Sequence, residues 1–139
     1  MTSRTVVLLC VSVLFACGSD DGTDTGKSGF FVSGSTPEQG AVNATVTQAP
    51  EFRLSSLADP ALCNESQFLF SGMDESGEFA FDVEFGLSFQ EEGRTLLLTH
   101  SEPLLNGFWY AAMVLDKEEP CRDITGRPIA PFGVEFFVP

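Results

Sequence analysis

Cationic side chains and histidine are scarce in this 139-residue sequence. It has 7 lysines and arginines against 20 aspartates and glutamates, a formal net charge of −13, and one histidine, His100. A chain of this charge repels the phosphate backbone of nucleic acids, so nucleic acid is not an expected partner. A single histidine cannot supply a metal site that depends on several imidazole ligands. The sequence therefore predicts no nucleic-acid binding, no metal and no other cofactor.

The usual sequence signs of catalysis are also missing. The sequence has no G-x-S-x-G motif to hold a nucleophilic serine beside His100. The carboxylate pairs Glu91-Glu92 and Glu118-Glu119 fall in predicted turns, whereas a glycosidase needs two carboxyl groups that face each other across a cleft. We therefore expect that the protein is not an enzyme, and we interpret His100 as a turn or surface residue.

The only long apolar run lies near the start of the chain. Residues 5–16 are apolar apart from Ser12, and a short polar segment with one charge, Arg4, precedes them. The run is too short to cross a bilayer core, which takes about 20 apolar residues. This pattern is typical of a signal peptide over residues 1–16. The alternative is a buried strand or helix of the domain, which the polar residues 18–22 disfavour.

The sequence Leu14-Phe15-Ala16-Cys17 resembles the lipobox of bacterial lipoproteins. The resemblance implies that the Cys17 thiol receives a diacylglycerol and that cleavage leaves Cys17 as the first residue. Two or three acyl chains would hold the protein stably on a membrane, because one chain alone binds only marginally. The resemblance thus predicts a lipid-anchored protein of the bacterial cell envelope, on the outer membrane. An ordinary secretory signal with an incidental cysteine is the alternative.

Two of the four cysteines, Cys63 and Cys121, have no role once the signal peptide and the lipid anchor are assigned. In an exported protein such a pair is most simply a disulfide. The bond would close a loop of about 60 residues, which is worth about 4 kcal/mol in the chain-entropy model. A metal site is the rival interpretation, but the sequence has no C-x-x-C motif to support it.

Residues 17–29 read as a flexible linker and residues 30–139 as one β domain. The linker is mostly Gly, Ser, Thr and Asp, and it would span about 20 Å root-mean-square. After it, short β patterns alternate with turn residues, beginning with an expected strand at residues 30–32, and no amphipathic helix is evident. This arrangement predicts an antiparallel β-sandwich of about seven strands.

The clearest periodicity lies between residues 79 and 89. Six apolar residues alternate there with small or polar ones: Phe79, Phe81, Val83, Phe85, Leu87 and Phe89. Alternation of period two predicts a half-buried strand. Because eleven residues are long for one strand, Gly86 is expected to mark a bulge or bend. Residues 91–94 should then turn the chain into a β-hairpin with residues 95–99.

The order of several motifs resembles the bacterial Ig-like domain of the S-layer-protein type. These motifs are Ser35–Ala41 (STPEQGA), Leu96–Thr99 followed by Pro103-Leu104, Asn106–Tyr110 (NGFWY), Asp123–Ile129 (DITGRPI) and Val134–Phe137 (VEFF). The resemblance covers residues 30–139. It implies an Ig-like fold that serves as a structural or interaction module.

Three residues have expected structural roles. Tyr110 follows Leu104 by six residues at a strand start, which suits a tyrosine corner whose hydroxyl returns to upstream backbone. Asp123 can accept hydrogen bonds from the N–H groups of its loop, and Gly126 can supply the positive φ of a turn. If Cys63 follows the second strand and Cys121 precedes the last one, both cysteines lie at the same end of the sandwich.

Trp109 is the candidate binding residue. In residues 108–115 both alternating faces are apolar, with Tyr110 on one face and Trp109 on the other. One interpretation is a central strand whose outer side is covered by the N-terminal segment or by neighbouring side chains. The other is an exposed patch that binds a partner protein or a sugar.

These features favour a membrane-anchored, non-catalytic structural or interaction module. Its expected partners are the membrane, through the lipid on Cys17, and an envelope protein or polysaccharide. The alternative is a sugar- or peptide-binding envelope protein that uses the loop end near Cys63 and Cys121 or the Trp109 face. A small envelope hydrolase is the third and least favoured hypothesis.

Overall fold

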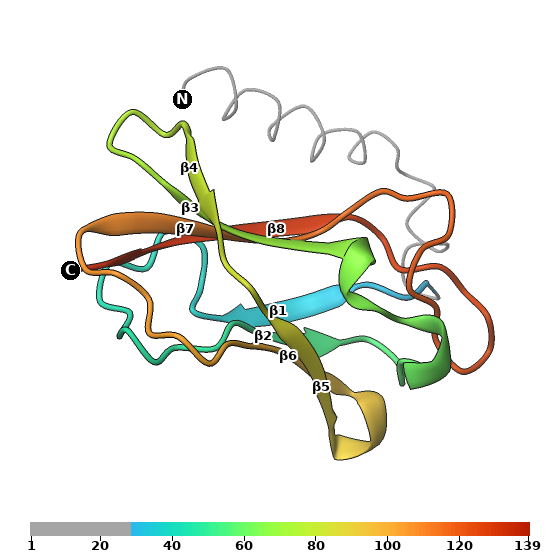
Figure 1. The fold of residues 1–139 in the computed structure, drawn as a ribbon. Helices are drawn as coiled ribbons and strands as arrows, with labels where there is room; N and C mark the ends of the chain where they lie inside the picture. The colour runs from blue at the N-terminus through green and yellow to red at the C-terminus, as the bar shows by residue number, and fades with distance from the viewer. Residues whose placement is uncertain (1–28) are drawn as a thin grey trace, which may run out of the picture.

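The computed structural model describes residues 29–139 (Figure 1). The predicted signal peptide of residues 1–16, the predicted lipidation site Cys17 and the linker as far as residue 28 lie outside the described residues. In the described part of the chain, no helix is long and apolar enough to cross a bilayer.

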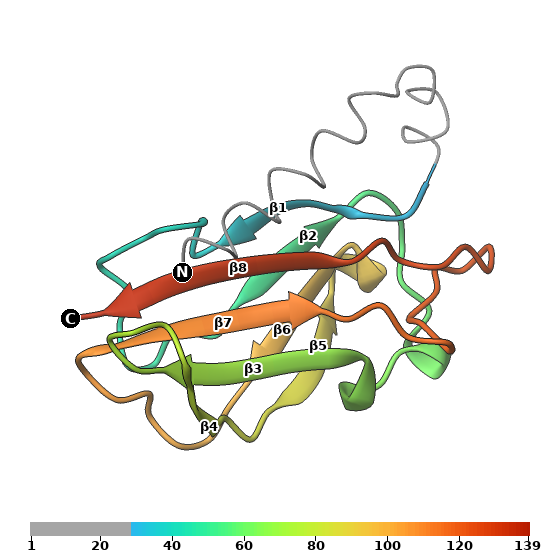
Figure 2. The ribbon, with the colours of Figure 1, turned by 90° about the horizontal axis from the view of Figure 1, so that it is seen from above.

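Eight strands and three short 3₁₀ helices make up the described fold. The strands are β1 Val32–Thr36, β2 Glu51–Leu54, β3 Phe68–Met73, β4 Phe79–Asp82, β5 Gly86–Gln90, β6 Thr95–Thr99, β7 Phe108–Val114 and β8 Phe132–Val138. The 3₁₀ helices are η1 Pro60–Leu62, η2 Glu65–Gln67 and η3 Glu91–Gly93. The eight strands form two antiparallel four-stranded sheets, β1-β2-β6-β5 and β4-β3-β7-β8, which stack face to face (Figures 1 and 2). The predicted Ig-like antiparallel β-sandwich is therefore confirmed.

Alternate residues of each sheet point inward and form one core. The fully buried side chains include Phe52, Leu96 and Leu98 from one sheet and Phe70, Tyr110, Val134 and Phe136 from the other. The ring of Tyr110 lies 5.9 Å from that of Phe136 and 6.0 Å from that of Phe70. Large aromatic rings bury more apolar area than aliphatic side chains, which helps a domain of this size to fill its interior.

The predicted single strand over residues 79–89 is wrong. The chain forms β4 in one sheet, crosses the edge of the sandwich at residues 83–85, and enters the other sheet as β5. Alternate residues nevertheless point inward through the whole segment. The side chains that pack against the core, first from one sheet and then from the other, are Phe81, Val83, Phe85, Leu87 and Phe89. Phe79 is the exception, since 63% of it is exposed. Periodicity thus identified the inward residues but not the change of sheet.

The first strand also lies later than predicted. It begins at Val32 rather than at Phe30, and Phe30 instead makes an isolated bridge to Ile129. Only 2% of Phe30 is exposed, so this aromatic side chain closes the end of the core ahead of the strand.

The two ends of the sandwich carry different structures (Figure 1). At one end lie the start of the described chain, the segment between β2 and β3, and the loop between β7 and β8. We call this the disulfide end, because both Cys63 and Cys121 lie in it. At the other lie residues 37–40, the turn between β3 and β4, and the loop between β6 and β7. We call this the tryptophan end, because Trp109 is the second residue of β7.

Candidate functional site

The predicted disulfide is present at the disulfide end. Cys63 and Cys121 are bonded, and their Cα atoms lie 4.3 Å apart. Cys63 follows η1, and Cys121 lies in the loop before β8, so the bond joins two loops at the same end of the sandwich. Beside it, the Asp59 N–H donates to the Arg122 carbonyl at 3.0 Å. The bond and the backbone contact together hold these loops in place.

Asp123 organises the same end from a fully buried position. Its carboxylate accepts from the Ser56 hydroxyl at 2.6 Å, from the backbone N–H groups of Thr125 and Arg127, and from Arg127 Nε at 2.9 Å. Burial alone would raise the pKa of Asp123, but the hydrogen bonds from Ser56, Arg127 and Thr125 outweigh it and hold that pKa well below its ordinary value. The carboxylate therefore stays charged and is fully used within the protein.

Gly126 completes the loop around Asp123. Its φ is 89°, a left-handed conformation that glycine adopts without strain. The Gly126 carbonyl accepts from Arg122 Nη1 at 2.9 Å. Among the described residues, the polar groups of this loop hydrogen-bond one another, so the loop is a structural element of the disulfide end.

Tyr110 links β7 to the loop before it. Its hydroxyl accepts from the Leu105 N–H at 2.7 Å, a return to upstream backbone as in a tyrosine corner. Burial raises the pKa of Tyr110, although the hydrogen bond from Leu105 opposes the shift. The hydroxyl therefore acts as a fixed acceptor that positions the loop between β6 and β7.

The outer surfaces of the two sheets differ in chemistry. The β1-β2-β6-β5 sheet carries mostly polar outward residues: Glu51, Arg53, Ser88, Gln90, Thr95, Leu97 and Thr99. The β4-β3-β7-β8 sheet carries mostly apolar ones, namely Leu69, Met73, Phe79, Trp109, Ala111, Met113 and Phe137, together with the polar Ser71, Asp82 and Glu135. We call this second surface the apolar face. The solvent side of an antiparallel sheet is usually polar, so the apolar face is the exception that needs an explanation.

Trp109 lies within the apolar face on the central strand β7. It is half-buried, and its ring lies 5.5 Å from that of Phe137 on β8. On its other side it pairs with Met73 of β3, which in turn pairs with Phe79 of β4. Four apolar side chains, one from each strand, therefore form a row across the sheet at the tryptophan end.

A hollow of about 230 Å³ opens beside Trp109. Its lining includes Gln39, Met73, Glu75, Trp109 and Glu135. Gln39 Oε1 accepts from the Glu135 N–H at 2.9 Å, which fixes residues 37–40 against β8. The hollow therefore combines an aromatic ring and a thioether with carboxylates, on a backbone that is held in place.

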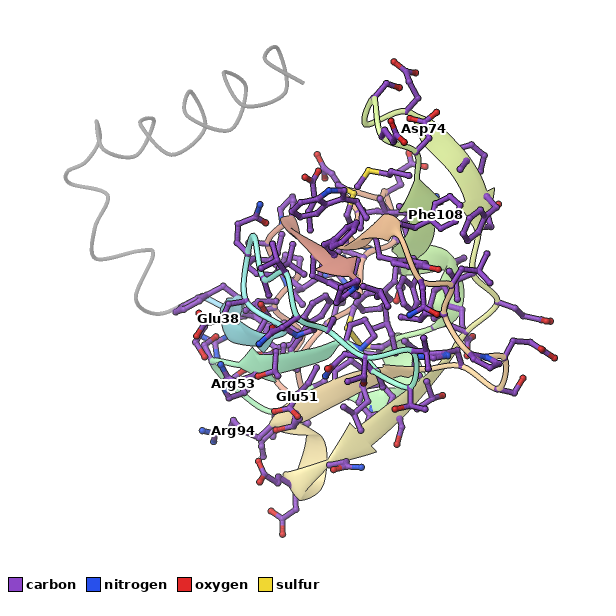
Figure 3. The ribbon with its side chains drawn as sticks, turned by 90° about the vertical axis from the view of Figure 1, so that its left-hand side faces the viewer. Glu38, Glu51, Arg53, Asp74, Arg94 and Phe108 are labelled. Atoms are coloured by element: carbon purple, nitrogen blue, oxygen red, sulfur yellow. A yellow bond between two sulfur atoms is a disulfide. The ribbon has the colours of Figure 1, made fainter. Side chains whose placement is uncertain are left out.

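Asp74 lies in the turn above this hollow, at the exposed tip in Figure 3. Hydrogen bonds from the Ser76 hydroxyl and from the Glu78 N–H lower the pKa of Asp74 below its ordinary value. Asp74 thus shapes the turn and keeps a negative charge at the rim of the hollow.

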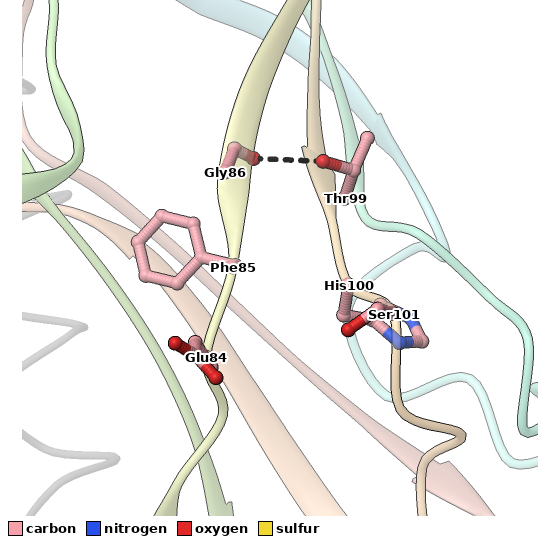
Figure 4. Close-up of a pocket in the computed structure, with 6 residues that line it drawn as sticks. All are labelled: Glu84, Phe85, Gly86, Thr99, His100 and Ser101. Atoms are coloured by element: carbon pink, nitrogen blue, oxygen red, sulfur yellow. Dashed lines mark hydrogen bonds between the residues drawn. The ribbon is translucent and has the colours of Figure 1, made fainter.

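A second hollow, of about 380 Å³, lies between Glu84–Gly86 and Thr99–Ser101 (Figure 4). His100 Nδ1 lies 2.7 Å from the Glu102 carbonyl oxygen, and Nε2 lies 2.6 Å from the Gln48 carbonyl oxygen. Both ring nitrogens of His100 thus face backbone carbonyls rather than the hydroxyl or thiol of a nucleophilic side chain. This hollow is larger than the one beside Trp109, but the ring nitrogens of its histidine both lie at hydrogen-bond distance from backbone carbonyls.

Within residues 29–139, no three His, Cys, Asp or Glu side chains are grouped as ligands of one ion.

Sequence reasoning named Trp109 but missed its neighbours Met73, Glu75, Phe79 and Glu135. The apolar character of both faces of β7 was visible in the sequence and predicted an apolar outer surface. The neighbours come from β3, β4 and β8, and their positions depend on strand register, which periodicity alone does not give.

No protein-family model and no curated protein matches the chain. Solved structures with a similar fold include domains 1–6 of the surface layer protein SbsC, with 15% identity and a TM-score of 0.55 over 78% of this chain. The N-terminal part of the bacterial S-layer protein SbsC aligns with 14% identity and a TM-score of 0.56 over 82% of this chain.

A copper resistance protein is similar at the same level. PcoC from Escherichia coli, described as methionine-rich, aligns with 12% identity and a TM-score of 0.54 over 81% of this chain and 100% of its own. By contrast, the alignments cover 13% of the six-domain SbsC structure and 24% of its N-terminal part. The likeness is one of fold, an Ig-like β-sandwich shared with these proteins.

Proposed function

We propose that this protein is a lipid-anchored, non-catalytic interaction module of the bacterial cell envelope. The observation that carries the proposal is the apolar face, with a hollow beside Trp109, on an otherwise strongly acidic domain. On this face Phe79 is exposed and Leu69, Trp109, Met113 and Phe137 are half-buried, whereas Met73 and Ala111 are buried. Apolar surface that remains in contact with solvent on a soluble domain often marks an interaction site. The lipobox-like sequence that ends at Cys17 supports the anchoring half of the proposal.

The position of the first described residues supports attachment at the disulfide end and interaction at the tryptophan end. The Ser55 hydroxyl donates to the Gly29 carbonyl at 3.1 Å, and Phe30 pairs with Ile129, so the described chain begins at the disulfide end. A lipid on Cys17 would tether the domain by that end, through a linker of about 20 Å. The tryptophan end would then face away from the point of attachment.

The contacts of His100 with backbone carbonyls support the non-catalytic part of the proposal. General base catalysis needs a ring nitrogen within hydrogen-bond reach of the proton to be removed. Both nitrogens of His100 instead lie at hydrogen-bond distance from backbone carbonyls. A hydrolase that used His100 would have to rearrange the loops that hold these carbonyls.

The copper link of PcoC is not carried over to this chain. Within residues 29–139, Met73 and Met113 both lie on the apolar face but pair with Trp109 and Leu69, four positions apart along the sheet. At about 3.3 Å per residue this separates them by about 13 Å, too far for one ion. The described thioethers are therefore better explained as apolar surface.

A sugar- or peptide-binding protein is the second candidate, and the hollow beside Trp109 favours it. Of the two sites predicted for such a ligand, the disulfide end is filled by its own hydrogen bonds around Asp123. The tryptophan end is the better supported location for a bound ligand.

Replacement of the lipidated cysteine tests the proposed anchoring. Cys17→Ala should remove acyl labelling and release the protein from the membrane fraction or stall its processing. Cys10→Ala is the matched control, because Cys10 lies inside the predicted signal peptide and should not affect anchoring. Unchanged detergent partitioning and acyl labelling of Cys17→Ala would refute the proposal.

A further inference from the structure

The apolar face carries negative charge and, in the described chain, no cation. No lysine or arginine lies in β3, β4, β7 or β8. Lys117, Arg122 and Arg127 lie in the loop between β7 and β8, at the disulfide end. Arg53 and Arg94 lie with the other sheet, far from Asp74 and Phe108 at the tryptophan end (Figure 3). Among residues 29–139, the charged side chains that line the hollow beside Trp109 are therefore all carboxylates.

Two carboxylates line the hollow without a hydrogen-bond donor among residues 29–139. Glu75 is exposed at the tip of the turn between β3 and β4, and Glu135 is half-buried on β8. Residues 29–139 donate no hydrogen bond to the carboxylate of either one, whereas the Asp74 carboxylate accepts from Ser76 and Glu78. Within the described part of the chain, Glu75 and Glu135 are thus the charged groups of the hollow whose carboxylates accept no internal hydrogen bond.

Charge decides between the possible occupants of this face. A second copy would bring another acidic surface onto the first, since each chain has a formal net charge of −13. Like charges placed opposite each other at an interface cost several kcal/mol. Anionic lipid would be repelled for the same reason. The carboxylates instead complement a partner that is itself basic.

We propose that the apolar face binds a polypeptide segment in which a lysine or arginine is flanked by apolar residues. The cationic side chain occupies the hollow, with its charge over the Trp109 ring and between Glu75 and Glu135. A cation within about 6 Å of an indole face is attracted by the ring quadrupole. The apolar neighbours cover Phe79 and Phe137. This assignment rests on the proposed interaction function and names its partner class.

Trp109 allows a direct test, because it is the only tryptophan in the chain. The processed full-length protein in detergent micelles is titrated with acetyl-Leu-Arg-Leu-amide, acetyl-Leu-Gln-Leu-amide or acetyl-Leu-Glu-Leu-amide while Trp109 fluorescence is recorded. The arginine peptide should bind at least about fivefold more tightly than the glutamine peptide and should weaken with added salt. The glutamate peptide should bind most weakly. A neutral chitin disaccharide serves as the competing ligand class.

Matched charge variants locate the site. Glu75→Gln and Glu135→Gln should each weaken the arginine peptide about threefold to tenfold and leave the glutamine peptide unchanged. Glu118→Gln is the control, because it removes the same charge from an exposed position at the disulfide end. Circular dichroism and urea unfolding establish that each variant is folded. If Glu118→Gln weakens binding as much as Glu75→Gln, the effect is bulk electrostatics and the proposed site is wrong.

The other outcomes are equally decisive. Equal binding of all three peptides, binding of the disaccharide alone, or no binding of any probe would overturn the assignment of a basic partner. None of these results affects the membrane attachment that is tested by Cys17→Ala. Conversely, a Cys17→Ala protein that remains anchored would overturn the proposed anchoring while the peptide result stands.

Discussion

At the disulfide end, the Cys63–Cys121 bond and the buried Asp123 join segments that are far apart in the sequence. At the tryptophan end, a turn of acidic residues stands beside a half-buried indole ring and a hollow that opens to solvent. The Asp123 carboxylate at the first end is paired inside the protein, whereas the carboxylates of Glu75 and Glu135 at the second end accept no hydrogen bond from residues 29–139. The residues that stabilise the fold and the residues proposed to bind a partner therefore lie at opposite ends of the strands.

This separation has a consequence for mutational effects. Substitutions at the disulfide end should lower the free energy of unfolding and leave ligand binding intact. Substitutions of exposed groups at the tryptophan end should weaken ligand binding and leave the free energy of unfolding unchanged.

Removal of the disulfide should have the largest effect. The double variant Cys63→Ser/Cys121→Ser frees a loop whose cysteines are 58 residues apart, which should lower the free energy of unfolding by about 4 kcal/mol. Urea unfolding at neutral pH measures the change. Affinity for the arginine peptide should be unchanged wherever the variant is folded, and a parallel loss of affinity would show that the two ends are coupled.

Asp123→Asn should rank second. The substitution removes the charge that accepts from Ser56, Thr125 and Arg127 and leaves buried donors poorly paired. The expected loss is about 3 kcal/mol of unfolding free energy, read from the same urea curves. A loss below about 1 kcal/mol would mean that the buried network is not a main support of this end.

The pH dependence of that loss follows from the lowered pKa of Asp123. A depressed carboxyl pKa contributes stability that is fully present above the unfolded value of about 4 and is lost as the pH falls toward the folded value. The stability difference between wild type and Asp123→Asn should therefore narrow by about 1 kcal/mol at about pH 3. An unchanged difference in acid would contradict this account of Asp123.

Tyr110→Phe should have a smaller effect. It keeps the ring that stacks on Phe136 but removes the acceptor of the Leu105 N–H. The expected loss is about 1 kcal/mol, the net value of one hydrogen bond. Hydrogen exchange should show faster exchange of the Leu105 amide. If that amide is unaffected, the hydroxyl does not position the loop between β6 and β7.

Glu75→Gln should leave the free energy of unfolding unchanged to within about 0.5 kcal/mol, as expected for an exposed side chain that accepts no hydrogen bond from residues 29–139. Its effect should instead be on the affinity for the arginine peptide. A clear loss of stability would show that Glu75 supports the turn and that it cannot be read as a binding residue alone.

Much of the fold followed from the sequence, because inward residues repeat with a period of two in most strands. The same pattern misled at residues 79–89, where the chain changes sheets while its side chains continue to point into one core. Both arrangements place alternate residues inside, so periodicity cannot tell one long strand from two strands in different sheets.

The candidate site was predictable only in part. Trp109 stood out because both faces of its strand are apolar. Its neighbours could not be derived, because Met73, Phe137 and Glu135 are brought to it by registers between strands that are distant in the chain. For Cys63 and Cys121, by contrast, pairing followed from counting the cysteines that had no other role.

Hydroxyl-radical footprinting in native envelopes tests the central claim most directly, namely that the apolar face is an interaction surface. Oxidation of Phe79 and Trp109 is compared between intact envelopes and the purified protein by mass spectrometry. Leu62 and Leu97 are internal controls, since one lies at the disulfide end and the other on the outer surface of the opposite sheet. The account predicts protection of Phe79 and Trp109 in envelopes, with Leu62 and Leu97 unchanged. Equal oxidation of Phe79 and Trp109 in both samples would contradict it.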